Sequence, residues 1–331
     1  MRPRVDPVAA GLLLGFVADC VLGDPRRGHP VAGFGRYAAW VERRCYLPDR
    51  LPDRLPDRLP DRRRTRFSGG YAVAAALAPP LALGVAAGRA PAPARVLLTA
   101  AATWAVLGGR SLAVEGHELQ RLLGADDLAG ARLRIRNLVG RDPSRLTADE
   151  LARACVESIA ENSSDAVVAP LCWGAVAGPA GLLGYRAVNT LDAMWGHRSP
   201  RYREFGWAAA TLDDVANWAP ARLTVAVTAA LAGRRGRQVI AVARRDGPQH
   251  PSPNAGPVEA AWAAALDVRL GGSNDYDGVI EDRGRLGDGP PVTRADIPRA
   301  TRQLGRVSWA TLGVVLLARA AVRRTLPKRR S

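Results

Sequence analysis

The sequence contains a single lysine, Lys328, among its 331 residues. A P-loop nucleotide site follows the pattern G-x-x-x-x-G-K-[ST] and places a lysine on the phosphates, so this kind of site is excluded. A buried Schiff-base lysine is disfavoured as well, because Lys328 lies in an arginine-rich C-terminal segment. If the protein uses ATP, it does so without a P-loop.

Cysteines and aromatic residues are also scarce. The four cysteines are scattered, with no C-x-x-C pair and no Cys/His cluster at zinc spacing, which excludes the common zinc sites. The net charge of +16 favours either nucleic acid or an anionic membrane surface as a partner. Aromatic residues make up 5% of the chain and do not interleave with the basic runs, so nucleic acid is not expected.

Long uncharged stretches, in contrast, are present. Phe67–Gly88 and Ala166–Tyr185 are each long enough to span a bilayer. Shorter apolar stretches occur at Pro7–Ala18, Val96–Gly109, Leu223–Gly233 and Val307–Ala318. Alanine, leucine and arginine favour helix, and alternating β-branched runs are almost absent. The sequence therefore predicts an all-α, multi-pass helical protein of the cell membrane with roughly five spanning segments. A soluble protein with buried alanine-rich helices is the alternative.

Basic clusters and polar segments complete the predicted layout, which is one membrane-embedded domain over residues 1–331. Arginine clusters flank the apolar stretches, and the positive-inside rule places those flanks and the C-terminus in the cytoplasm. Residues 47–62 repeat "LPDR" four times. Proline in every turn prevents a helix, so 47–66 is predicted to be a dispensable low-complexity loop. Residues 244–292 are predicted to form a polar, Gly/Pro-rich cytoplasmic loop region around a short helix.

An acidic stripe stands at the edge of an apolar stretch. Glu157, Glu161 and Asp165 in "ESIAENSSDAVVAP" are spaced four residues apart. On a helix they fall within about an 80° arc, where like charges repel unless water or a cation screens them. A solvated helix face is one interpretation. The other is a site for magnesium and phosphate, because magnesium binds carboxylates together with substrate phosphates.

Acid and amide residues recur on two further predicted helices, each close to apolar sequence. "NTLDAMWGH" contains Asn189 and Asp192, and "TLDDVANW" places Asp213 and Asp214 within one turn of Asn217. Charges near a bilayer usually face the protein interior and mark function. We therefore expect Asp213 and Asp214 to bind magnesium.

"GPAG" at Gly178–Gly181 lies near the middle of the second long apolar stretch. Glycine and proline there predict a turn, so that the flanking helices form an antiparallel hairpin. The hairpin brings Asp165 level with Asp192. We therefore expect the acidic stripe and the Asn189–Asp192 pair to share one site.

Three loop segments hold weaker candidates. Asp24, Arg26 and His29 in "LGDPRRGHPV" are either ordinary loop residues or phosphate contacts. Arg141 in "VGRDPSRLTADE" is a possible phosphate contact, and His250 in "HPSPNAG" is a possible base or phosphate ligand. In the segment after Arg141, Thr147 and Glu150 have the spacing of a capping box.

The motifs together resemble a known family. "LGDPRRGHPV", "GGRSLA", "VGRDPSRL", "ESIAENSSDAVVAPL", "YRAVNTLDAMWG", "RYREFGWAAATLDDVANWAPARLT", "HPSPNAG" and "VRLGGSN" occur in the order seen in the adenosylcobinamide-phosphate synthase family of cobalamin biosynthesis. The likeness covers about residues 10–320. Two departures are the inserted LPDR repeat and the aspartates of "GGSNDYDG", where relatives often have a more neutral, aromatic stretch.

The resemblance implies a multi-pass membrane enzyme that makes cobinamide or its phosphate. It would join the f-propionate carboxylate of cobyric acid to aminopropanol or aminopropanol phosphate, with ATP as co-substrate and Mg²⁺ as cofactor. The corrinoid cobalt belongs to the substrate. Membrane lipid and other late enzymes of the pathway are the further partners expected. The acids Glu157, Glu161, Asp165 and Asp192 and the base His250 are the catalytic candidates. The candidates for binding substrate or phosphate are Asp24, Arg26, His29, Arg141, Asn162, Asn189, Arg201, Asn217 and Asn254.

Two other functions stay open on the residues alone. A membrane magnesium-dependent prenyltransferase also holds a diphosphate with Asp/Asn-rich helices, and "LDDVAN" suits it. A non-enzymatic corrinoid-binding or transport subunit would bind substrate without consuming ATP. Turnover of an isoprenoid diphosphate, as against consumption of cobyric acid, separates these functions.

Overall fold

The fold is described in a computed structural model over residues 6–25, 28–46, 62–140, 142–197, 199–276 and 279–325; for 273–276 and 279–281 it covers the backbone. Most of these residues are helical, which confirms the predicted all-α class. The chain forms two compact units. Unit 1 comprises Met1–Leu107 and Pro170–Ala216, and unit 2 comprises Gly108–Ala169 and Asn217–Ser331.

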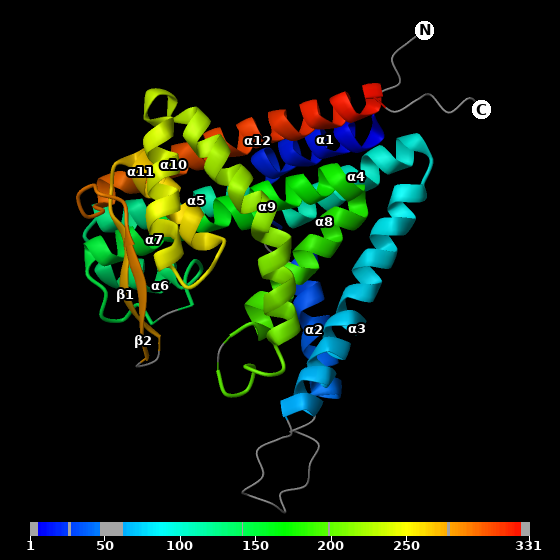
Figure 1. The fold of residues 1–331 in the computed structure, drawn as a ribbon, viewed down its shortest axis with the longest axis horizontal. Coiled ribbons are helices and arrows are strands. Elements are labelled where there is room, and N and C mark those ends of the chain that lie inside the picture. Colours follow the sequence, from blue (N-terminus) through cyan, green and yellow to red (C-terminus); the bar gives the residue numbers. More distant parts are fainter. Residues whose placement is uncertain are drawn as a thin grey trace, which may run out of the picture. The chain divides into compact units, whose positions relative to one another are not determined.

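Figure 1 labels the main elements along the chain. The first helices are α1 Pro7–Leu22, α2 Pro30–Cys45, α3 Arg62–Arg89, α4 Ala92–Val106, α5 Gly109–Gly124 and α6 Leu128–Ile135. The central helices are α7 Ala148–Ser163, the π-helical turn η2 Ser164–Val168, α8 Ala169–Trp195 and α9 Trp207–Leu231. The last elements are α10 Gly236–Asp246, η4 Gly247–Gln249, α11 Ala255–Leu266, β1 Leu270–Tyr276, β2 Val279–Leu286 and α12 Ile297–Thr325.

Within the described residues, four helical segments are long and apolar enough to cross a membrane, which fits a multi-pass membrane protein. A fifth apolar helix, Pro7–Leu22, is shorter. Roughly five spans were predicted and four segments qualify by length and composition; the stretch at Leu223–Gly233 is not among them. The four long segments are Arg62–Arg89, Ala92–Gly124, Ala148–Trp195 and Arg294–Thr325.

Unit 1 is built from α1 packed on α4, from α2 packed on α3, and from α8. Its largest buried rings are Trp195 at the end of α8 and Phe205 in the following loop, 5.4 Å apart between ring centroids. Glu42 of α2 is buried beside them, and it accepts hydrogen bonds from Trp195 Nε1 (3.2 Å) and from the Tyr202 hydroxyl (2.9 Å). A buried carboxylate is tolerated when such donors compensate it.

The chain turns sharply inside α8, as "GPAG" predicts. Gly178 has φ 61° and ψ −142°, outside the helical region and in the part of φ space that favours glycine. A Cβ added at Gly181 would collide with the backbone oxygen of Trp173, eight residues earlier. In a straight helix these positions would lie about 12 Å apart. The predicted turn at Gly178 is therefore present within unit 1, while the level match of Asp165 with Asp192 stays a prediction.

Unit 2 surrounds α7, most of which is buried. Helices α5, α6, α11 and α12 all pack against it. The predicted capping box starts α7: the Glu150 backbone N–H donates to Thr147 Oγ1, and Glu150 Oε2 accepts from the Thr147 backbone N–H at 2.8 Å. Beyond α7 the helix passes into the π turn η2. Such turns occur frequently at functional sites.

One small sheet was missed by the sequence prediction. Strands β1 and β2 form an antiparallel hairpin in unit 2, with Leu270 opposite Leu286 and a bulge between Gly271 and Ser273. Within the region 244–292 expected to be mostly loop, the described residues also include α11. In the region 47–66, residues 47–61 lie outside the described part, and α3 begins at Arg62.

Candidate functional site

A cavity of about 480 Å³ lies within unit 2, between the first turns of α7 and the hairpin. Its lining includes three arginines, Arg153, Arg269 and Arg285, together with the acids Asp149 and Glu150. Arginine presents its N–H donors in a planar fork that matches phosphate and carboxylate oxygens. The arginines therefore suit an anionic ligand, while Asp149 and Glu150 reduce the positive charge of the lining. The rest of its lining comes from Leu270, Gly271, Gly272, Pro291 and Val292.

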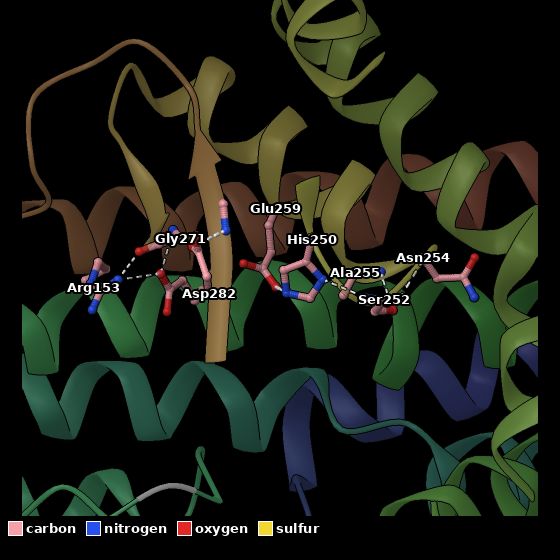
Figure 2. A network of polar contacts seen from close by, with 10 residues as sticks. Arg153, His250, Ser252, Asn254, Ala255, Glu259, Gly271 and Asp282 are labelled. Atoms are coloured by element: carbon pink, nitrogen blue, oxygen red, sulfur yellow. Dashed lines mark hydrogen bonds and ion pairs between the residues drawn. The ribbon is translucent and has the colours of Figure 1, made fainter. Parts of the chain in front are cut away.

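A buried carboxylate fixes one wall of this cavity. Glu157 Oε1 accepts a hydrogen bond from the Gly271 backbone N–H at 2.8 Å and lies 3.6 Å from Arg153 Nη1. Arg153 in turn donates to the Gly271 carbonyl. Figure 2 shows Arg153 pointing toward the start of β1. We call these three residues the α7–β1 clasp, because they tie the helix to the hairpin.

The clasp depends on a glycine at residue 271. Gly271 has φ 79°, and an added Cβ would collide with the carbonyl oxygen of Gly284 on the opposite strand. A side chain would therefore force the two strands apart. An added Cβ on the adjacent Gly272 would come within 3.2 Å of Arg153 Nη1, on the cavity side. The two glycines of "VRLGGSN" thus allow the close approach of arginine to the backbone.

A histidine–carboxylate pair is buried in the same unit. The imidazole Nε2 of His250 lies 3.6 Å from Glu259 Oε1 of α11, and both side chains are at most 2% exposed. The Ser252 backbone N–H donates to His250 Nδ1 at 3.0 Å, so Nε2 carries the proton of the neutral ring. Burial, and after it the Arg283 guanidinium, lowers the pKa of His250 to about 4, so the ring is neutral near pH 7.

The sequence analysis missed Glu259, although a signal was present. It is the one charged residue of α11, in a run of alanine and other apolar residues. A charged side chain is seldom buried without a partner. A lone acid in an apolar helix therefore indicates a buried partner, and Figure 2 shows His250 beside Glu259.

The rest of "HPSPNAG" builds the start of α11. Ser252 Oγ accepts hydrogen bonds from the backbone N–H groups of Asn254 (3.3 Å) and Ala255 (3.1 Å). The side-chain oxygen of Asn254 accepts from Arg222 Nη1 at 2.7 Å. Arg222 also lies over the ring of Trp218, 4.9 Å from its centroid. The candidate Asn254 therefore orients an arginine of α9.

The acidic stripe does not form a solvated face, so that interpretation is wrong. Glu157 is 5% exposed, and Glu161 and Asp165 are half-buried. Asn162 donates its amide to the Ser158 carbonyl at 2.9 Å and is also half-buried. The stripe belongs to unit 2 and Asn189–Asp192 to unit 1, so their shared site stays a prediction.

Residues of the second and third acid/amide groups meet in unit 1, which ends at Ala216 and does not include Asn217. Asn189 of α8 donates its side-chain amide to Asp213 Oδ1 of α9 at 3.3 Å, and Arg186 Nη1 lies 3.5 Å from Asn189 Oδ1. Asp192 is half-buried and Asp214 exposed. Asn217, farther along α9, is buried.

The described residues contain no group of three or more His, Cys, Asp or Glu side chains placed to hold a metal ion. The pair Asp213 and Asp214 can supply only part of a magnesium shell by itself. Since magnesium usually completes its shell with substrate phosphates and water, this arrangement does not decide the expected site. Magnesium binding stays a prediction.

Three further candidates have structural partners in unit 1. His29 accepts a hydrogen bond from the Val31 backbone N–H, which caps α2, and its Nε2 lies 3.4 Å from Asp24. Arg201 donates from Nε (3.2 Å) and Nη2 (3.1 Å) to Glu42. Arg26 and Arg141 lie outside the described residues.

Comparison with known proteins places these motifs in context. The family model described as CobD/Cbib protein matches residues 12–304. The protein named "Cobalamin biosynthesis protein CobD" of Mycobacterium tuberculosis is 46% identical over 319 residues, which are 94% of this chain and 96% of that protein. Proteins of the same name from Chromobacterium violaceum (41%, covering 93% and 95%) and Pelobacter propionicus (35%, covering 97% and 98%) are also similar. No solved structure matches the chain.

Proposed function

Because this chain belongs to the CobD/Cbib family of cobalamin biosynthesis, we propose that it is an ATP-dependent amide-forming ligase. The enzyme joins the f-propionate carboxylate of cobyric acid to the amino group of aminopropanol or aminopropanol phosphate. It acts in the cell membrane, and the arginines that end α12 lie on the cytoplasmic side.

The reaction needs an activated carboxylate. A carboxylate oxygen attacks the γ-phosphorus of ATP, the bond from that phosphorus to the ADP oxygen breaks, and an acyl phosphate forms. The neutral amine nitrogen then attacks the acyl carbon. The carbon–oxygen bond to phosphate breaks, inorganic phosphate leaves, and the nitrogen loses a proton to a base.

The arginine-lined cavity of unit 2 is the observation that supports this chemistry best. We assign the triphosphate of ATP to it, with Arg153, Arg269 and Arg285 as the contacts. Glu157 acts through Arg153: it accepts from Gly271 and faces the guanidinium, and so holds the arginine at the cavity wall. Glu157 is therefore proposed as a positioning residue, although the sequence suggested a catalytic one.

A proton acceptor is needed at the amine. His250 is neutral near pH 7 and so has a lone pair on its ring, but burial and Arg283 lower its pKa to about 4, which makes it a weak base. Glu161 and Asp165, half-buried at the end of α7, are the alternative acceptors.

Magnesium would neutralise the charge of the phosphate-bearing amine when it is bound in unit 1. The donor set of Asn189, Asp213 and Asp214 fits it in type, because amide and carboxylate oxygens are the hard ligands that this ion takes alongside phosphates. Asp214→Asn is expected to raise the magnesium requirement or abolish turnover. Unchanged magnesium dependence after Asn substitution at each aspartate in turn would reject this role.

The decisive experiment is an assay of the full-length protein purified in detergent. It receives ATP, cobyric acid and each amine in turn, and mass spectrometry detects the amide product while ADP is measured in parallel. Arg153→Gln and Arg285→Gln should raise the KM for ATP. Arg244→Gln removes an exposed arginine of α10 that does not line the cavity, so it is the matched control.

Three outcomes would contradict the proposal. Turnover of an isoprenoid diphosphate without consumption of cobyric acid would indicate a prenyltransferase. Corrinoid binding with no ADP release under any condition would indicate a binding or transport subunit. If both cavity variants form the amide with a normal KM for ATP, the proposed reaction would stand but the cavity would not be the ATP site.

A further inference from the structure

A basic and aromatic surface covers the start of α3 in unit 1. Helix α3 begins with three arginines and reaches a fourth at Arg66. Directly after them, the rings of Phe67 and Tyr71 are 81% and 64% exposed. α3 is also one of the segments apolar enough to cross a membrane. The surface therefore lies where a candidate span meets its arginine-rich end.

Two tryptophans flank this surface, each beneath an arginine. The Arg66 guanidinium lies 4.8 Å from the ring centroid of Trp207, whose Nε1 donates to the Arg66 carbonyl at 2.9 Å. The Arg44 guanidinium of α2 lies 4.2 Å from the ring centroid of Trp40. Tryptophan and tyrosine of this kind gather at the headgroup level of a bilayer.

Two cavities open on this surface and share Arg63, Phe67 and Tyr71. One, of about 570 Å³, is completed by Arg44, Cys45, Arg64 and Ser68. The other, of about 510 Å³, is completed by Arg66, Gly70 and Trp207. Each cavity thus has guanidinium groups beside apolar rings, and no acid is among its described lining residues.

The positive charge here is not explained by the stability of α3. Basic side chains in the first turn of a helix oppose its dipole, which favours anions at that end. The carboxylate of Glu204 lies 3.2 Å from Arg62 and 3.6 Å from Arg66, so one acid faces two arginines. Among the residues that the structure describes at this surface, arginines outnumber acids, which favours an anionic partner.

We propose that this surface binds an anionic phospholipid of the surrounding bilayer. The headgroup phosphate contacts the guanidinium groups of Arg63 and Arg64, and the acyl chains lie along Phe67 and Tyr71 toward the apolar part of α3. A soluble anion would satisfy the arginines and leave the two exposed rings without a function. A lipid satisfies both, since its phosphate and its chains are joined.

The test uses the full chain in nanodiscs that contain brominated phosphatidylglycerol or brominated phosphatidylcholine, which quench nearby tryptophan. The difference in quenching between the wild type and Trp207→Phe gives the quenching of the tryptophan at this surface. Wild-type protein should prefer the anionic lipid, and high salt should weaken that preference. Arg63→Gln with Arg64→Gln should lower it by about fivefold for each arginine removed.

Arg89→Gln is the matched control, because Arg89 is an exposed arginine at the other end of the same helix. It should leave the preference unchanged. Equal quenching by both lipids in the wild type, or an equal loss in the control variant, would overturn the proposal. If the double variant fails to fold, the salt dependence of the wild type decides: a preference for the anionic lipid that high salt does not weaken would overturn the proposal.

Discussion

The α7–β1 clasp gives a prediction whose size follows from the structure. Glu157→Ala removes the acceptor of the Gly271 N–H and the carboxylate that faces Arg153. A hydrogen bond to a charged group contributes roughly 1.5–3 kcal/mol, and Glu157 is buried enough for that range to apply. Amide exchange at the start of β1 should therefore be about 10- to 150-fold faster in this variant.

Hydrogen–deuterium exchange of a peptide covering β1, read by mass spectrometry, measures this. Glu157→Gln keeps an acceptor for Gly271 and should retain most of the protection, while the KM for ATP still rises because Arg153 loses its anion. Glu118→Gln is the control, since it breaks an exposed Arg–Glu pair on α5 with no link to the hairpin. If β1 exchanges in the Glu157→Ala variant as slowly as in the wild type, the clasp is refuted.

Three further predictions concern His250, the LPDR repeat and the acidic residues. The pKa of His250 is about 4 in the folded protein and about 6.5 in the unfolded chain. Its contribution to the free energy of unfolding, about 3 kcal/mol, is therefore complete above pH 6.5 and lost as the pH falls toward 4. Thermal melts of the purified protein should show a smaller loss of stability at acid pH in His250→Asn than in the wild type. Deleting residues 51–61, which spares α3, should leave amide formation nearly intact; an inactive but folded deletion would contradict this. Glu161→Gln and Asp192→Asn should each lose activity, and the double mutant should be little worse than either; additive losses would separate the two sites.

Local features of the fold could be predicted from the sequence. The turn at Gly178 follows from glycine and proline inside an apolar stretch, because no other residue takes its backbone conformation as easily. The capping box of Thr147 and Glu150 follows from spacing alone. In both cases the interaction is complete within a few residues, so the signal lies in one short segment.

The cavity could not be predicted in the same way. Arg153 and Arg285 are more than a hundred residues apart, and both stand in a chain that contains 46 arginines. No spacing distinguishes them from arginines on the surface. The hairpin that brings them together lacks the alternating pattern of a half-buried strand, since its start depends on glycines with positive φ. Long-range pairing of this kind leaves little trace in a single sequence.

The three acids before the apolar stretch have different surroundings, with different electrostatic consequences. A carboxylate buried like that of Glu157 needs donors near it, and Gly271 and Arg153 supply them. Recruiting Glu157 to a cation would leave Arg153 facing no anion and would release β1 from α7. Glu161 and Asp165 are half-buried and therefore more accessible than Glu157. If a cation or a substrate amine is bound at the end of α7, Glu161 and Asp165 are therefore the acids to receive it.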